Sequence, residues 1–259
     1  MRINITKKEI NKMNIGLLGF GNVGQSVLDI LIENQTLLTQ RTDTHLTVSK
    51  VLVRDMNKKR SGNTNGVTFT NNADDILNDP EIDIVVEVMG GEFPAYDYIK
   101  QALSNKKYVV TANKEVMSKH KREFFQIAFD NNVDIYYEAA VGGGIPLIRT
   151  LKVGLAANKI ESLYGIVNGT TNYILTKIEE EHQDFDVVLK KAQELGFAEA
   201  DPTMDIAGLD SAHKLVILAA VAFKVDIQLD NLFHEGIQNI TLKDIQYANE
   251  LGYTIKLLS

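Results

Sequence analysis

The 259-residue sequence contains no cysteine, no tryptophan and only four prolines. The absence of cysteine excludes a disulfide framework and thiolate metal sites, and it fits a reducing cytoplasm. No apolar run approaches the roughly 18 residues of a membrane span, and the N-terminal segment MRINITKKEINK lacks the apolar core of a secretory signal. We therefore predict a cytoplasmic protein that has no membrane partner.

Positive charge is also scarce, with 27 basic residues against 34 acidic ones and a formal net charge of -7. Such a surface does not attract phosphate backbones non-specifically, so we do not expect a nucleic-acid partner. Hydrophobic residues make up 44% and charged residues 24% of the chain, which is the balance of a globular protein with a buried core. Because the chain is longer than one ordinary core supports, we expect two domains.

From Met13 onward, the first half alternates short β-branched runs with longer helical patterns. Buried strands are predicted at 14–20, 45–53, 67–70, 83–88, 107–112 and 133–139, and helices at 23–38, 73–78, 94–104 and 115–130. This alternation is typical of the α/β class and predicts a doubly wound parallel sheet, a Rossmann nucleotide domain, over 13–145. Residues 1–12 are expected to be an N-terminal extension.

The loop VGGGIP at 141–146 ends the alternation, and Pro146 suits the first turn of a new helix. A second domain is therefore expected over 146–259. Its sequence predicts a strand at 159–168 and three helices, at 170–182, 185–196 and 208–223. We expect an α+β domain that binds substrate and, because its sheet would be left with an open edge, forms a homodimer.

The strongest local motif is Gly19-Phe20-Gly21-Asn22-Val23-Gly24, which follows the first strand and opens a helix. Gly19 permits a tight turn, Gly21 lets the backbone approach a pyrophosphate, and Gly24 lets the helix pack closely on the strand. A glycine-rich turn alone is a weak signal. Its place inside a predicted βαβ unit favours a dinucleotide site.

The end of the second strand bears on which nicotinamide cofactor is favoured, because an acid there binds a ribose hydroxyl and an arginine accommodates a 2′-phosphate. The sequence has Arg54 followed by Asp55, with Lys58, Lys59 and Arg60 close behind. The cations favour NADP, whereas Asp55 leaves NAD open. A charged loop that is merely solvated is the alternative.

Two further regions carry reactive side chains. Lys114 follows a buried strand at the sheet edge where such folds bind ligands, although a surface lysine that begins a helix would look the same. Farther on, Asp210 and Lys214 are four residues apart on one helix face and can pair. The pair could place an ammonium as a proton donor, or it could be only a helix cap and salt bridge.

No histidine and acid spacing suggests a catalytic metal, and His213 is expected to lie in the core or on the surface because it points away from Lys214. Glu138 precedes the glycine-rich loop, where backbone carbonyls could join it in holding a hard cation. From the residues alone, a domain hinge is the simpler interpretation of that loop.

Five motifs in order, namely GFGNVG, TANKEVMS, EAAVGGGIPLIRTL, IVNGTTNYIL and ELGFAEADPTMDIAGLDSAHKL, resemble homoserine dehydrogenase over roughly residues 13–225. The resemblance implies an oxidoreductase that interconverts L-aspartate 4-semialdehyde and L-homoserine with NAD(P)H, a step of threonine, methionine and isoleucine biosynthesis. Two other functions remain open: a catalytically silent nucleotide-binding or regulatory module, and another amino-acid dehydrogenase on the same fold.

The resemblance also implies roles for individual residues. Lys214 matches the family's proton donor, Lys114 a lysine between cofactor and substrate, and Glu199 and Asp210 substrate-binding carboxylates. Cofactor contacts would come from Phe20, Asn22, Val23, Arg54 and Gly196, and a monovalent cation, usually sodium, would be held by Glu138 and the carbonyls of Val141, Gly143 and Ile145. Family members continue beyond the position of Ser259 to complete the nucleotide domain, so we expect this chain to be truncated at its C-terminus.

Overall fold

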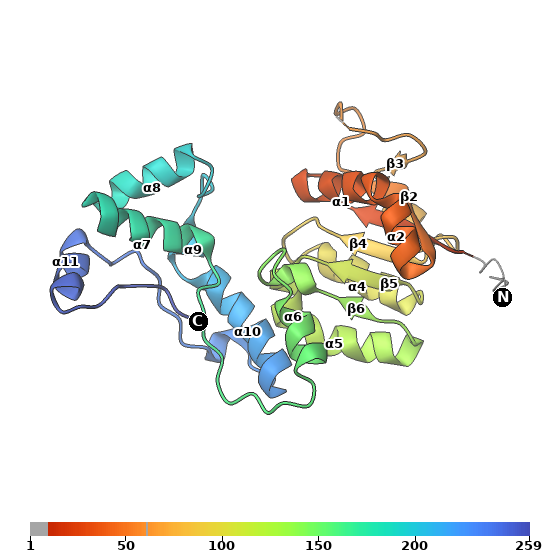
Figure 1. The fold of residues 1–259 in the computed structure, drawn as a ribbon. Helices are drawn as coiled ribbons and strands as arrows, with labels where there is room; N and C mark the ends of the chain where they lie inside the picture. The colour runs from red at the N-terminus through yellow and green to blue at the C-terminus, as the bar shows by residue number, and fades with distance from the viewer. Residues whose placement is uncertain (1–9, 61) are drawn as a thin grey trace, which may run out of the picture. The chain divides into compact units, whose positions relative to one another are not determined.

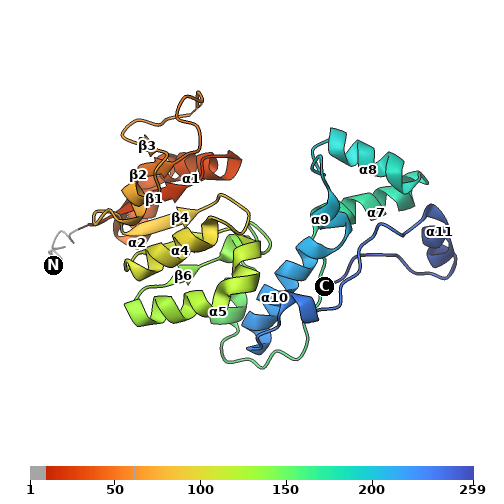
Figure 2. The same ribbon diagram turned by 180° about the vertical axis from the view of Figure 1, so that it is seen from behind.

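The computed structural model describes residues 10–60 and 62–259, which form two compact units (Figures 1 and 2). The first unit ends at Ala140 and the second runs from Val141 to Ser259, so the glycine-rich loop belongs to the second unit. The first strand begins at Asn11 rather than at Met13, and the rest of the expected N-terminal extension, residues 1–9, lies outside the described residues. No described helix is long and apolar enough to cross a membrane.

The first unit contains a six-stranded sheet in the order β3-β2-β1-β4-β5-β6, and every pairing is parallel. Its strands are β1 (Asn11–Leu18), β2 (Thr44–Leu52), β3 (Thr68–Thr70), β4 (Ile84–Glu87), β5 (Tyr108–Thr111) and β6 (Ile135–Tyr136). The order reverses at β1, so right-handed crossovers lead to opposite faces on its two sides. The predicted doubly wound sheet is confirmed, and ligands of such sheets bind outside the carboxyl ends of β1 and β4.

Helices lie between the strands of this unit along the chain, except that two of them follow β1 and none separates β2 from β3 (Figure 1). They are α1 (Asn22–Glu33), α2 (Gln35–Thr42), α3 (Asp74–Leu77), α4 (Ala95–Ser104) and α5 (Lys114–Asn131), and a 3₁₀ turn at Glu138–Ala140 ends the unit. The prediction of one helix over 23–38 was wrong. The helix breaks at Asn34, whose φ of -100° and ψ of 15° are not helical, although neither glycine nor proline marks the break.

Burial explains why these segments form a parallel sheet. Leu17 and Leu18 are adjacent in β1, point to opposite faces, and are both fully buried. Strands covered on both faces need such continuous apolar runs rather than alternating ones. Ile15 and Leu17 pack with Leu28 of α1 and Val51 of β2, which fixes the first helix on the sheet and with it the turn that precedes the helix.

The second unit is built from helices. They are α6 (Leu147–Arg149), a π turn at Thr150–Gly154, α7 (Gly169–Glu181), α8 (Phe185–Glu194), α9 (Thr203–Ile206), α10 (Leu209–Phe223), a 3₁₀ turn at Leu229–Asn231, and α11 (Leu242–Glu250). Ile174 and Ile178 of α7 pack with Val188 of α8 and Ile245 of α11 in one core. The sequence did not predict α11, which begins at a capping box made by Thr241 and Asp244.

The predicted strand at 159–168 was wrong. This segment has no regular structure, and among the described residues its only backbone pairing with a distant segment joins Gly165 and Ser259 through two hydrogen bonds of 2.9 Å. A strand needs a ladder of such bonds and a buried face, whereas Tyr164 is 82% exposed. The described part of this unit is therefore helical, with one pair of extended segments in place of a sheet.

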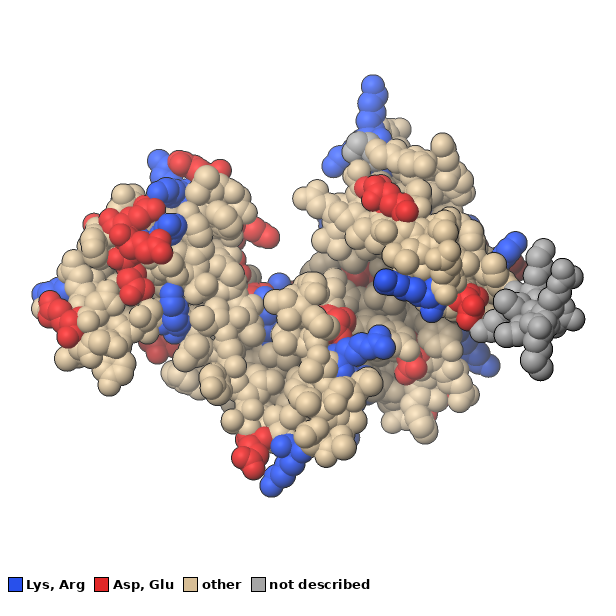
Figure 3. Space-filling model, in the orientation of Figure 1, with Lys and Arg blue, Asp and Glu red and all other residues tan. Residues whose placement is uncertain are grey.

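The face of the second unit that Figure 3 shows carries many acidic side chains over α7 and α8, with lysines among them. Ion pairs neutralise part of this charge, including Lys177 with Glu180 at 2.8 Å and Lys191 with Glu181 at 2.8 Å. Charges that face solvent in such pairs contribute little stability. Charged side chains of this kind keep the face in contact with water.

Candidate active site

The glycine turn after β1 has the backbone geometry that its sequence predicts. Gly19 has a φ of +100°, which a side chain would strain, and its N–H donates to the carbonyl of Leu52 at 3.2 Å. A Cβ on Gly24 would lie 2.2 Å from the carbonyl oxygen of Gly19. Both glycines are therefore required for the turn and for the close approach of α1 to it.

Gly21 differs from its two neighbours in the motif because a Cβ there would meet nothing within 4 Å. It is exposed, and it occupies the N-cap position of α1, where no side chain caps the helix. The N–H groups of the first helical turn need an external acceptor, and the helix dipole favours an anion there. An open, uncapped turn of this kind fits the pyrophosphate of a dinucleotide.

In the charged loop after β2, Arg60 is bound to other residues of the loop, whereas Arg54 is exposed. Arg60 donates to the carbonyls of Asp55 and Lys58, and its guanidinium lies 4.8 Å from the ring centre of Phe69, so it is committed to the loop. Phe69 in turn packs edge-on against Phe20, with ring centres 5.3 Å apart. Arg54 is exposed and makes no hydrogen bond or ion pair among the described residues, so it can meet a ligand.

Lys114 is the first residue of α5, and its neighbour Asn113 is held by hydrogen bonds of both its side chain and its backbone. The Asn113 side chain accepts from Val116 N at 3.2 Å and donates to the carbonyl of Gly91 at 2.7 Å, while its backbone N–H donates to the hydroxyl of Thr111 at 2.9 Å. That hydroxyl donates to the fully buried carboxylate of Glu87 at 2.6 Å. These bonds fix the backbone at the start of α5, and with it the position from which the Lys114 side chain extends at the edge of the sheet.

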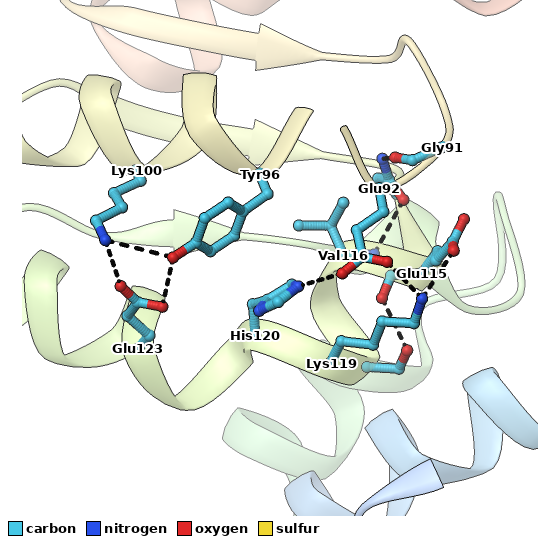
Figure 4. A network of polar contacts seen from close by, with 11 residues as sticks. Gly91, Glu92, Tyr96, Lys100, Glu115, Val116, Lys119, His120 and Glu123 are labelled. Atoms are coloured by element: carbon cyan, nitrogen blue, oxygen red, sulfur yellow. Dashed lines mark hydrogen bonds and ion pairs between the residues drawn. The ribbon is translucent and has the colours of Figure 1, made fainter. Parts of the chain in front are cut away.

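A second set of contacts joins the loop after β4 to α5 (Figure 4). Glu92 lies between Lys119 and His120, with one carboxylate oxygen 2.6 Å from Lys119 Nζ and the other 2.7 Å from His120 Nε2. These hydrogen bonds, the one from Lys119 first, hold the pKa of Glu92 below its usual value. The loop beside the carboxyl end of β4 is thus held to α5 by an ionised side chain as well as by Asn113.

In the second unit, Asp210 and Lys214 form the pair that their spacing predicts. Lys214 Nζ lies 2.7 Å from Asp210 Oδ2 and donates to the carbonyl of Val167 at 2.8 Å. The Asp210 side chain is only 4% exposed and that of Lys214 17%, so the pair is shielded from water. An ammonium carries three N–H groups, so one remains for a ligand.

Asn168, which sequence reasoning did not single out, connects this pair to a second acid. Its side-chain N–H groups donate to Asp210 Oδ2 at 2.8 Å and to Asp205 Oδ1 at 2.7 Å. Its side-chain oxygen accepts from Thr171 N at 2.8 Å and so caps α7. The motif IVNGTTNYIL contained the signal, since an asparagine before a helical pattern is a typical N-cap, but nothing in it identifies the two carboxylates.

A cavity of about 610 Å³ opens beside this cluster, and it lies entirely within the second unit. It is lined by Asn168, Gly169, Thr170, Asn172, Tyr173, Thr176, Lys177, Gly196, Phe197, Asp205, Asp210 and Lys214. Tyr173 and Phe197 stack with ring centres 4.4 Å apart and form an aromatic wall. The cavity therefore combines carboxylates, an ammonium and an aromatic surface, which suits a small zwitterionic ligand.

Other predicted residues lie apart from this cluster. Glu199 is exposed and is absent from the cavity lining, and His213 is buried in α10. In the glycine-rich loop, the carbonyl of Ile145 already accepts a hydrogen bond from Leu147 N at 2.8 Å. The described residues contain no group of three or more histidines and acids placed to share a metal ion.

The parallel sheet and its open glycine turn define the first unit as a dinucleotide-binding domain of the Rossmann class. Comparison with protein families agrees, since residues 19–138 match the NAD binding domain of homoserine dehydrogenase and residues 146–259 match the homoserine dehydrogenase domain. The chain belongs to the homoserine dehydrogenase family, a family of oxidoreductases.

Individual relatives support the same assignment. Homoserine dehydrogenase of Bacillus subtilis is 45% identical over 246 residues, which cover 95% of this chain and 57% of the relative. The crystal structure of homoserine dehydrogenase from Thiobacillus denitrificans superposes with a TM-score of 0.91 at 46% identity, covering 96% of this chain and 57% of that one. A hyperthermophilic archaeal homoserine dehydrogenase in complex with NADPH gives a TM-score of 0.74 at 25% identity, covering 88% and 75%. The chain thus spans slightly more than half the length of the two bacterial proteins.

Proposed function

We propose that this chain carries the reactive residues of an enzyme that interconverts L-aspartate 4-semialdehyde and L-homoserine with NAD(P)H. This reaction is a step of threonine, methionine and isoleucine biosynthesis. The observation that carries the proposal is the shielded Asp210–Lys214 pair in the wall of the cavity of the second unit. Membership of the homoserine dehydrogenase family supplies the reaction type to which this pair is suited.

The chemistry of the pair suits the reduction of an aldehyde. A bound nicotinamide dinucleotide supplies the hydride, which adds to the aldehyde carbon and leaves negative charge on the oxygen. The third N–H of Lys214 can stabilise that charge and then transfer its proton to give the alcohol. Asp210, which accepts a hydrogen bond from Lys214, keeps the ammonium directed from α10 toward the cavity.

Recognition of the substrate needs acceptors for its ammonium group. In this proposal Asp210 and Glu199 supply them. Support for Asp210 comes from its place in the cavity lining. Glu199 follows the aromatic wall residue Phe197 by two positions and rests on the family resemblance alone, because its side chain is exposed.

The cofactor contacts belong to the same proposal. The open turn supplies four of the contacts that the resemblance implies, from Phe20, Gly21, Asn22 and Val23. Lys114 and Gly196 complete that set. We expect NADP to bind better than NAD, because Arg54 is exposed and uncommitted and can meet the 2′-phosphate. The resemblance also supports a structural sodium ion at Glu138 and the carbonyls of Val141, Gly143 and Ile145.

The decisive experiment follows NADPH absorbance in the presence of L-aspartate 4-semialdehyde, with NADH in a parallel reaction. Turnover with this aldehyde supports the proposal, and faster turnover at low NADPH than at equally low NADH supports the cofactor preference. Cofactor binding without turnover of any amino-acid aldehyde would favour a silent nucleotide-binding or regulatory module. Turnover of a different amino-acid substrate would assign another dehydrogenase on this fold.

We expect a homodimer formed through the second unit. The support is the pair of extended segments that meet at Gly165 and Ser259, where exposed Tyr164 and Leu258 leave backbone and apolar side chains available to a second copy. Sedimentation velocity at micromolar concentration should show the mass of two chains. A monomer at that concentration would contradict this expectation.

A further inference from the structure

The side chain of Asn168 makes three hydrogen bonds within the protein, two from its N–H groups and one to its oxygen, although it lines the cavity. Asn168 is 4% exposed, and the two N–H groups of its amide contact two different carboxylates, those of Asp205 and Asp210. Like charges brought this close repel each other, and each would otherwise turn toward water. A neutral amide that donates to both is a connection that holds them side by side without adding a charge.

The same side chain fixes the backbone next to the ammonium. Its oxygen caps α7 through Thr171 N, so the backbone at 167–168 cannot shift without losing the cap. The carbonyl of Val167, immediately before it, is one of the two acceptors that hold Lys214 Nζ. The other acceptor is Asp210 Oδ2, the same oxygen that Asn168 contacts. Both partners of the lysine therefore depend on one asparagine.

We propose that Asn168 is a positioning residue of the active site: it orients the carboxylates of Asp205 and Asp210 and, through Asp210 and the Val167 carbonyl, the ammonium of Lys214. This inference rests on the proposed function for the role of Lys214. Asn168 itself need not contact the substrate, because both N–H groups and the oxygen of its amide already have partners within the protein.

A serine at this position separates the two tasks of Asn168. Serine caps helices about as well as asparagine, so Asn168→Ser keeps the α7 cap, but its short hydroxyl cannot reach both carboxylates. Asn168→Ala removes the cap as well. Thr241→Ala is the matched control, because it removes the side-chain cap of α11 and does not touch the cavity.

Two readouts distinguish positioning from a general loss of structure. With L-homoserine and NADP as substrates, kcat/KM should fall by roughly 10- to 100-fold in Asn168→Ser, as expected when charged groups lose their hydrogen bonds, while the Kd for NADP stays unchanged. Acetylation of Lys214 by acetic anhydride, measured by mass spectrometry, should become severalfold faster, because an ammonium that is no longer held by its two acceptors gives up a proton and reaches the anhydride as the free amine more readily. Thr241→Ala should change neither quantity.

The acetylation arm does not depend on turnover. If the unaltered chain turns over no L-homoserine, the proposed function fails, yet faster acetylation of Lys214 in Asn168→Ser still supports the positioning role. Unchanged acetylation together with unchanged kcat/KM would overturn it. If Asn168→Ser does not fold, amide hydrogen exchange of the unaltered protein provides the test. Both side-chain amide protons of Asn168 should exchange with water far more slowly than those of exposed Asn65. Equally fast exchange would overturn the inference.

Discussion

The two units form their candidate ligand sites from different parts of the chain. The first unit uses backbone: Gly19 and Gly24 are required by the shape of the turn, and Gly21 leaves helix N–H groups uncovered. The second unit uses side chains, since Asn168, Asp210 and Lys214 determine one another through hydrogen bonds. A substitution at the glycine turn of the first unit therefore acts mainly by filling space that the turn or a ligand needs. A substitution at the cluster of the second unit acts mainly by removing charge and hydrogen bonds.

The largest expected effect is that of Lys214→Met, which keeps much of the length of the side chain and removes its proton and charge. Because general acid catalysis acts on the chemical step, kcat should fall by about 10²- to 10⁴-fold while cofactor affinity stays near its original value. Steady-state kinetics and a cofactor titration measure the two. Near-normal turnover would remove Lys214 from the mechanism and leave Lys114 or water as the proton donor.

The next effect tests the backbone site by comparing two glycines of one motif. In Gly24→Ala the new Cβ lies 2.2 Å from a carbonyl oxygen, so the free energy of unfolding should fall by about 1–3 kcal/mol, as overpacking requires. In Gly21→Ala the Cβ meets no protein atom, so stability should be kept while the Kd for NADP rises at least about tenfold, because the backbone can no longer approach the pyrophosphate. Urea unfolding and fluorescence titration measure both. Unchanged NADP binding in Gly21→Ala would place the pyrophosphate elsewhere.

Arg54→Ala tests the one place in the first unit where a side chain is expected to select the ligand. Loss of a charged contact to the 2′-phosphate should weaken NADP about tenfold and leave NAD unchanged. Isothermal titration with each cofactor gives the ratio of the two dissociation constants. If both affinities change equally, or neither changes, the charged loop is merely solvated.

The smallest effect concerns acid stability and the contacts of Figure 4. The pKa of Glu92 is lowered in the folded state, so its contribution to stability is present above the unfolded-state value and is lost as the pH falls through the lowered one. Glu92→Gln should therefore be less stable than the unaltered chain at pH 7, and this difference should shrink between about pH 5 and pH 3. Urea unfolding at several pH values measures it. A difference that does not change with pH would assign the effect to packing.

The sequence predicted the geometry of the glycine turn better than the full set of contacts around Asp210 and Lys214, and the reason is physical. The glycine turn and the sheet depend on local patterns, such as the apolar run of β1 and the spacing of Gly19, Gly21 and Gly24. The spacing of Asp210 and Lys214 on α10 is equally local, so their pairing was also predicted. Contacts between distant segments left no such trace: Asn168 is 42 residues from Asp210.

The errors in the fold have the same origin. The break at Asn34 was missed because no glycine or proline stands beside it to mark it in the sequence. The strand expected at 159–168 had suitable residues but lacks a neighbouring strand among the described residues, since only Gly165 finds a backbone partner in a distant segment. Strand formation depends on pairing with distant residues, and pattern alone does not supply that partner.

The short loop before α10 has a consequence for how fast the site can change shape. The buried Ile237 donates its N–H to the carbonyl of Ile206 at 2.8 Å, and a Cβ on Gly236 would lie 2.1 Å from that same carbonyl oxygen. The backbone between Asp205 and Asp210 is therefore held directly against the backbone of residues 236–237. The backbone that carries the two acids can therefore move only when the loop lifts away as a unit, which is a local unfolding event far slower than rotamer exchange.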